Sequence, residues 1–528
     1  MAAIRPPPMV RSATAAAPPV AEFTWKQRLT PKYFLLLIRD NPVANLLLIS
    51  AIIIGFFHGW LKLKFPGGIT VFAYDIPLML ALAMVMMKGS PGLPLFPKSR
   101  TSSALQVVMG ICIVYGLLPN DIPLLVRLAS FRGWALVPLM FLLGYHLFRS
   151  RELLNFYGSL ILLLSVITAI YGSRQDPEEL RRMAEANATL ENIMKGSFYG
   201  DEEGTKFRVF STFVSAGAFG STMAYSLLIG LARYSNKGHS IWSRVFLAMV
   251  LMPIAYGIFL SAARSAAIIA IIAVLLIAWY RKSLIKFALP PAVILGGLLV
   301  ASNLSGSSSM SRMSAVADPS ALMSRVAIVV RPAFNKLLDY PLGGGLGRSG
   351  HGLPAALGYL AGRYKWRPVD GDIGRVAVDF GIIGLVAFSA MFISGTRDSF
   401  LWMKQLRGTE LDTVAVIAGA MFVTAFISFP TGSPFLAIPM GAIIWFHLGA
   451  LNRLYDDHKR GLPVSVTGAL PTTPVPELKP GRRPLPKAAA TSSPLVPTPV
   501  VPTAPTPVVA KPKRFLYHGN GSKPGPRA

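Results

Sequence analysis

FLSAARSAAIIAIIAVLL, residues 259–276, is an almost unbroken apolar run with a single charge, Arg264. A helix that is apolar on every side is either deeply buried in a large protein or crosses a membrane. Similar runs recur along the 528-residue chain, which is 52% hydrophobic and only 14% charged. Its mean hydropathy is +0.51. This composition predicts an all-α polytopic membrane protein, because a spanning segment must satisfy its backbone hydrogen bonds internally.

Working outward from this run, we expect about twelve transmembrane helices, each long enough to cross a hydrocarbon core of about 30 Å. They are expected near residues 43–60, 67–87, 103–118, 130–148, 152–171, 216–232, 245–261, 264–280, 285–303, 375–395, 411–429 and 435–450. The third and fourth are the weakest, because Pro119, Pro123 and Arg127 interrupt the apolar pattern between them. One of these two is a candidate for a short or re-entrant segment.

The orientation follows from the basic residues in the short loops. Lys or Arg follows every even-numbered span, as Arg149 follows the fourth and Lys282 follows the eighth. Both termini are therefore expected in the cytoplasm, and the odd-numbered exits outside. Two of these outer loops are long: residues 172–207 are acidic and residues 304–374 are net basic. Within the first, Asp176 and Pro177 have the residue types that begin a helix.

The two ends of the chain differ from the membrane region in composition. Residues 1–42 are rich in Pro and Ala, and residues 461–528 are Pro-rich and basic, so both are expected to be disordered and cytoplasmic around a membrane domain of residues 43–460. Tails and cytoplasmic loops hold much of the formal charge of +28, so nucleic-acid binding is not needed to explain it. Cys112 is the single cysteine and the seven histidines are scattered, so neither a metal nor a cofactor is expected.

The basic outer loop contains DYPLGGGLGRSGHG, residues 339–352, in which Gly345, Gly347 and Gly350 have G-x-G-x-x-G spacing. That spacing indicates a nucleotide site only between a strand and a helix of one βαβ unit. No strand pattern precedes it and no Lys-Ser/Thr pair follows it, so Rossmann and P-loop sites are excluded. Two interpretations remain open: a tight turn at the membrane surface, or backbone N–H groups that contact a phosphate directly.

Four stretches resemble the O-antigen ligase and polysaccharide polymerase superfamily of bacterial inner membranes. FLSAARSAAIIAIIAVLL resembles its Ser-x-Ser-Arg segment, with Ala263 in place of the second Ser. SRVAIVVRPAFNKLLDYPLGGGLG (324–347) resembles its Arg-led segment with a terminal glycine turn, and VDGDIGRVAVDFGIIGLVAF (369–388) resembles the end of its large loop. FRVFSTFVSAGAFGSTMAYSLL (207–228) is similar to its Arg-x-x-Gly-Thr-Phe segment, with Ser211 in place of the Gly.

The resemblance implies a glycosyltransferase in the bacterial inner membrane. Such enzymes move a glycan from a polyprenyl-pyrophosphate donor to an acceptor hydroxyl at the periplasmic face, and their partners are membrane lipids and a chain-length regulator or flippase. Ligases of the family commonly carry a histidine near the end of the large loop. This chain has Asp370, Gly371 and Asp372 there. That departure favours a repeat-unit or exopolysaccharide polymerase over a lipid A-core ligase.

The implied chemistry needs cations for the pyrophosphate leaving group and a base for the acceptor hydroxyl. We expect the leaving group to be bound by Arg264, Arg208, Arg325, Arg375, Gly345 and Gly347. The base is Asp370 or Asp372, with His351 as the alternative. Each residue also has an alternative interpretation without a catalytic role. The arginines would reach from apolar helices to the interface, the aspartates would cap a helix, and the histidine would be an exposed loop residue.

Two other functions remain as alternatives. A secondary transporter or lipid flippase also fits twelve spans with both ends inside, but transporters are built from repeated halves and no internal repeat is visible. A noncatalytic scaffold would act through the Pro-rich tail. Asp75 is a carboxylate inside the second expected span, where such a group is costly unless it has a partner. We expect it to pair with a group on another helix.

Overall fold

The computed structural model describes residues 30–65, 70, 72–89, 93–118, 121–185, 190, 198–199, 206–236, 240–282, 319–350, 371–430, 432–462 and 464. All described residues lie in one compact unit, Met1–Ala469. The ninth expected span, Asp370, His351 and most of both expected tails lie outside the described residues.

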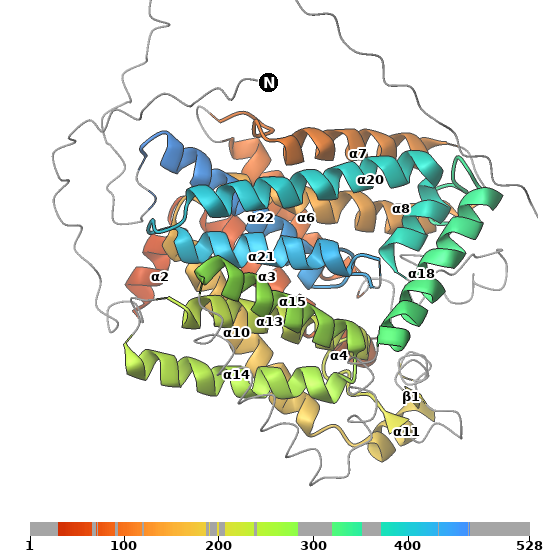
Figure 1. Ribbon diagram of the computed structural model, residues 1–528, viewed down its shortest axis with the longest axis horizontal. Helices are drawn as coiled ribbons and strands as arrows, with labels where there is room; N and C mark the ends of the chain where they lie inside the picture. Colours follow the sequence, from red (N-terminus) through yellow and green to blue (C-terminus); the bar gives the residue numbers. More distant parts are fainter. Residues whose placement is uncertain are drawn as a thin grey trace, which may run out of the picture. The chain divides into compact units, whose positions relative to one another are not determined.

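Helices make up almost all of the described structure (Figure 1). The first half contains α2 (Pro31–Ile38), α3 (Pro42–Phe56), α4 (His58–Lys64), α6 (Asp75–Lys88), α7 (Arg100–Leu117), α8 (Leu124–Phe131), the π-helix η1 (Arg132–Leu136), α9 (Val137–Leu147), α10 (Arg151–Ser173) and α11 (Pro177–Glu185). The second half contains α13 (Ala216–Tyr234), α14 (Ile241–Ser261), α15 (Arg264–Arg281), α18 (Pro319–Asp339), α20 (Asp372–Gln405), α21 (Asp412–Ser428) and α22 (Met440–Lys459). The short strands β1 (Phe198–Tyr199) and β2 (Lys206–Phe207) pair antiparallel.

Six helices among the described residues are long and apolar enough to cross a membrane, or seven if the bent pair α2 and α3 forms one span. The six are Arg100–Leu117, Val126–Leu147, Arg151–Ser173, Ile241–Ser261, Arg264–Arg281 and Asp372–Gln405. This establishes a multi-pass helical membrane protein at a coarser level than the twelve spans expected. The helices at the other described spans, such as α6, α13 and α21, are shorter or less apolar.

Two sequence-based expectations about local structure were wrong. The third and fourth spans, expected to be the weakest, are among the six. Pro123 lies just before α8 rather than inside a helix, and the Arg127 guanidinium donates to the carbonyls of Gly116 and Leu118, which closes the end of α7. Residues 31–38 form α2 rather than disordered chain, because Thr30 caps an apolar segment. The helix expected at Asp176 is confirmed as α11, and the Asp176 carboxylate accepts from the Glu178 N–H.

Side-chain contacts sort the helix ends into two groups. One end is called here the Gly-turn end, because the glycine-rich segment that follows α18 lies there. At this end, the Thr212 hydroxyl donates to the Phe56 carbonyl and the Tyr74 hydroxyl donates to the Pro439 carbonyl. At the opposite end, the Asp398 carboxylate accepts from the Thr101 hydroxyl at 2.7 Å. In Figure 1, α7, α20, α21, α13 and α14 run across the view, with α18 and α11 toward the right. The Gly-turn end is the end that the basic-loop pattern predicts to be periplasmic.

Helices α9 and α22 make a particularly close backbone contact in the core. A Cβ atom on Gly144 would lie 2.0 Å from the Phe446 carbonyl oxygen, and one on Gly449 would lie 1.9 Å from the Phe141 carbonyl oxygen. Each helix therefore presents a glycine to the backbone of the other, as in close helix packing inside membranes. All residues of α9 except Leu139, which is partly buried, are buried. This pair lies at the centre of the bundle.

Helix α20 is kinked at Gly381, which has φ 63° and lies in a conformation that favours glycine. At the kink, the Ile382 N–H donates to the Pro341 carbonyl at 2.9 Å, and the Gly344 N–H donates to the Val378 carbonyl at 2.7 Å. A Cβ atom at Gly381 would lie 2.3 Å from the Pro341 oxygen. The kink thus receives the glycine-rich segment that follows α18 and fixes it at the Gly-turn end.

Candidate functional site

Arg208 and Arg264 come from distant parts of the sequence and lie beside the same turn, residues 261–264, between α14 and α15. The Arg208 Nε donates to the Ser261 carbonyl at 3.2 Å, and the Val209 N–H donates to the Leu260 carbonyl at 3.2 Å. Arg264 is the first residue of α15. The sequence predicted both arginines as phosphate-binding residues, and the structure brings their backbones to one place.

The turn between α14 and α15 is fixed by its own residues. Ala262 adopts a left-handed conformation, with φ 45°, that ends α14, and the Ser261 hydroxyl accepts from the Ala263 N–H at 3.2 Å. Helix α13 packs closely against it, since a Cβ atom on Gly220 would lie 2.4 Å from the Ser261 Oγ. The Arg264 side chain is exposed and makes no hydrogen bond or ion pair with any described residue. Its guanidinium is therefore available to an external anion.

Arg375 belongs to a second polar group at the Gly-turn end, at the start of α20. Its Nη1 donates to the Ser433 hydroxyl at 2.9 Å and lies 3.7 Å from the Asp372 Oδ1. The Asp372 side chain is fully buried, and its Oδ2 accepts from the Phe435 N–H at 3.3 Å. Asp372 thus joins α20 to the segment between α21 and α22 and orients Arg375, which remains partly exposed.

The glycine-rich turn surrounds an anion that belongs to the protein itself. The Asp379 carboxylate on α20 accepts from the Ser349 N–H at 2.7 Å and the Ser349 hydroxyl at 3.0 Å, and also from the Gly347 N–H. Gly345 and Gly347 both have φ 94°, which requires glycine. The described geometry therefore accounts for these glycines as a turn around a carboxylate.

An ion pair holds the same turn against the connection between α7 and α8. The Arg348 Nη1 donates to the Asp121 Oδ2 at 3.0 Å, and a second, shorter bond joins the other guanidinium nitrogen to Oδ1. The hydrogen bond to Arg348 lowers the pKa of the Asp121 carboxyl below its usual value. Because the Asp121 side chain is largely exposed, this ion pair fixes the position of the turn but adds little to the stability of the protein.

The π-helix η1 positions two carboxylates at the Gly-turn end. The Arg132 Nη1 lies 2.9 Å from the Asp75 Oδ2 on α6, and the Trp134 Nε1 donates to the Asp379 Oδ2 at 3.1 Å. The expectation that Asp75 pairs with a group on another helix is confirmed. No role for Arg132, Trp134 or Asp379 was predicted from the sequence. The signal for Asp379 was present, since it is a carboxylate within an apolar run, as Asp75 is.

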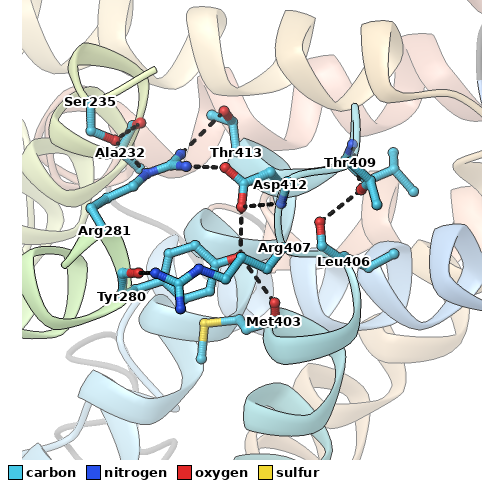
Figure 2. Close-up of polar contacts among 12 residues, drawn as sticks. Ala232, Ser235, Tyr280, Arg281, Met403, Leu406, Arg407, Thr409, Asp412 and Thr413 are labelled. Carbon is cyan, nitrogen blue, oxygen red and sulfur yellow. Dashed lines mark hydrogen bonds and ion pairs between the residues drawn. The ribbon is translucent and has the colours of Figure 1, made fainter. Parts of the chain in front are cut away.

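Polar contacts at the opposite end fasten α13, α15, α20 and α21 together (Figure 2). Arg281 forms an ion pair with Asp412, and its Nε donates to the Ser235 hydroxyl at 3.1 Å. The Tyr280 hydroxyl lies 2.6 Å from the Asp412 Oδ1 and 3.0 Å from the Met403 carbonyl oxygen. This cluster lies far along the helices from Arg264 and Arg375, and it holds the elements that carry them in a fixed arrangement.

The remaining predicted residues are described in part or not at all. Arg325 lies on α18, but its side chain is outside the described structure, as are the whole residues Asp370 and His351. Among the described residues, no group of three or more His, Cys, Asp or Glu side chains could hold a metal ion. No protein-family model matches the chain, and no curated protein sequence matches it.

Proposed function

We propose that this protein is a membrane glycosyltransferase that moves a glycan from a polyprenyl-pyrophosphate donor to an acceptor hydroxyl. The reaction takes place at the Gly-turn end, which we assign to the periplasmic face of a bacterial inner membrane. The observation that carries the proposal is the meeting of Arg208 and Arg264 at one rigid turn, from segments that are 56 positions apart in sequence. Both segments also resemble the polymerase and ligase superfamily.

Arginine suits the leaving group in this reaction. When the bond from the sugar C1 to the pyrophosphate oxygen breaks, negative charge grows on the pyrophosphate, and a guanidinium stays charged and binds two phosphate oxygens in a planar fork. Arg264 is exposed at the end of an apolar helix and has no described partner, so it is the residue to which we assign the donor pyrophosphate. Beside Arg264 and Arg208, Arg375 adds a further guanidinium whose direction is set by Asp372 and Ser433.

The acceptor hydroxyl needs a base while its oxygen forms the new bond to C1. Asp372 is buried and already engaged with Arg375 and the Phe435 N–H, so we assign it to positioning. We assign proton acceptance to Asp370, two residues earlier, with His351 as the alternative. The products are the lengthened glycan, the polyprenyl pyrophosphate and a proton on the base. The absence of the ligase histidine from its usual place favours a polymerase.

The test uses the full chain in proteoliposomes with polyprenyl-pyrophosphate-linked repeat units. Arg264→Lys keeps one positive charge but loses the planar fork, so polymer formation and release of polyprenyl pyrophosphate should both fall at least about 10-fold. Arg264→Ala should fall by about 100-fold or more, the usual effect of removing one group that stabilises developing charge. Arg174→Lys is the matched control, since Arg174 is exposed at the end of α10 on the same side of the bundle.

The control should retain parental activity, and all variants should elute as folded protein in size-exclusion chromatography. Full activity of Arg264→Lys would mean that this arginine only reaches toward the interface. Movement of the lipid-linked glycan across the bilayer, with no polymer and no released pyrophosphate, would favour the flippase alternative.

A further inference from the structure

A basic cluster at the Gly-turn end has no part in the transfer reaction proposed above. It consists of His58 and Lys62 on α4, Arg132 on η1, and their counter-ion Asp75 on α6. Helix α4 directly follows α3 and carries the chain beyond the apolar segment. The cluster therefore lies near the membrane surface. It is separate from Arg264 in sequence and shares no residue with the groups around Arg375.

The cluster holds more positive charge than its own carboxylate neutralises. The Arg132 Nη1 lies 2.9 Å from the Asp75 Oδ2, and the two side chains are only 16% and 4% exposed. Lys62 makes no hydrogen bond or ion pair with the described residues, although it interacts electrostatically with both Arg132 and Asp75. Two cations thus face one carboxylate in a region where charge is costly unless it is compensated.

His58 adds an unused polar atom to the same place. Its side chain is 2% exposed, and its Nδ1 has no hydrogen-bond partner among the described residues. It interacts electrostatically with Lys62 and Arg132, so its ring lies near both cations. Burial, followed by repulsion from Arg132, lowers the pKa of Lys62 to about 8, while Asp75 acts in the opposite direction. These groups are held together at an energetic cost that an anion would relieve.

We propose that His58, Lys62 and Arg132 form a binding site for the phosphate group of a membrane lipid. A lipid phosphate supplies the missing negative charge, accepts from the guanidinium and ammonium groups, and lies at the depth of the cluster. Exposed Trp60, Phe65 and Ile76 on and beside α4 and α6 offer apolar contact to the chains of such a lipid. The phosphate belongs either to an anionic phospholipid or to a polyprenyl phosphate.

The experiment measures lipid binding to the delipidated full-length protein by native mass spectrometry. Phosphatidylglycerol, a polyprenyl monophosphate and inorganic phosphate are titrated separately. Lys62→Gln should weaken binding of the lipid phosphate at least about 10-fold, which corresponds to about 1.4 kcal/mol. Lys64→Gln is the matched control, because it removes the same charge from an exposed position on the same helix and should change binding less than about twofold.

A second variant, Arg132→Lys, keeps a cation for Asp75 but removes the guanidinium fork, and it should also weaken binding. Equal lipid affinity in Lys62→Gln and Lys64→Gln would overturn the proposal, as would binding of inorganic phosphate without either lipid. The lipid that binds more tightly identifies the source of the phosphate. Arg264→Lys should leave phosphatidylglycerol binding unchanged while it lowers polymer formation, so a failure of the proposed transfer reaction would be recognised separately.

Discussion

Lys62 illustrates at the residue scale how a binding group can reduce the stability of the empty protein. Its pKa is lowered to about 8 in the folded chain, from the usual 10.5, because burial and Arg132 disfavour its charge. Below about pH 8 the charged form is present in both states and destabilises the folded one. As the pH rises from 8 toward 10.5, the folded state loses the proton first and the penalty declines.

We therefore predict that Lys62→Met stabilises the delipidated protein at pH 7, by about 1–3 kcal/mol after allowance for partial exposure. This advantage should shrink steadily above about pH 8. Thermal unfolding in detergent between pH 7 and pH 10 measures it. Lys64→Met should change the unfolding temperature little at any of these values, because Lys64 is exposed. If Lys62→Met stabilised the protein equally at every pH in this range, the stabilisation would come from the added apolar surface and not from removal of the charge.

The sequence predicted some of these residue contacts and could not predict others. Arg208 and Arg264 were chosen from motif resemblance and the cost of a charge in an apolar run, and their segments meet. The glycine spacing left open a tight turn or direct contact with a phosphate, and the described geometry is a turn around a carboxylate of the protein. It could not identify the carboxylate of Asp379, because that group lies about 30 positions away and reaches the turn only through the kink in α20.

At the scale of elements, the contact between α9 and α22 depends on two glycines. We predict that Gly449→Ala destabilises the protein by about 1–3 kcal/mol, the usual effect of overpacking, because its Cβ would lie 1.9 Å from the Phe141 carbonyl oxygen. Gly110→Ala on α7 is the control, since nothing lies within 4 Å of its Cβ position. The control should be neutral or slightly stabilising, because alanine favours the helix. Unfolding in a denaturing detergent series compares the two, and equal stability would show that the helices separate at little cost.

Hydropathy predicted the spans well where one uninterrupted helix is long and apolar enough to cross the membrane, as α14 and α15 are. It was less informative for α8, η1 and α9, where proline and arginine interrupt the pattern but the segment from Val126 to Leu147 is continuous enough to span. The π-helix itself has no clear sequence signal. Its extra residue turns Arg132 toward α6 and Trp134 toward α20, and only the packed structure reveals that pairing.

At the scale of the whole molecule, the two groups of helix ends predict opposite sides of the membrane for two positions. A reporter fused at Gly350 should read periplasmic, because the adjacent Arg348 pairs with Asp121 at the Gly-turn end. A reporter fused after Lys459 should read cytoplasmic, because α22 ends at the opposite end. Paired phosphatase and fluorescent-protein fusions measure both. The same side for both positions would contradict the helix arrangement, and exchanged sides would contradict the basic-loop rule for this chain.

The pairing of α9 with α22 has a consequence for biosynthesis. The ribosome makes α9 near residue 140, whereas its partner begins only at Met440. Until α22 is inserted, the face of α9 that carries Gly144 must be covered by lipid or by the insertion machinery. A chain that stops before residue 440 would therefore contain every described arginine of the proposed site and still lack a closed core. Such a chain should be degraded as an unfinished membrane protein, because the described bundle can close only after α22 has been made.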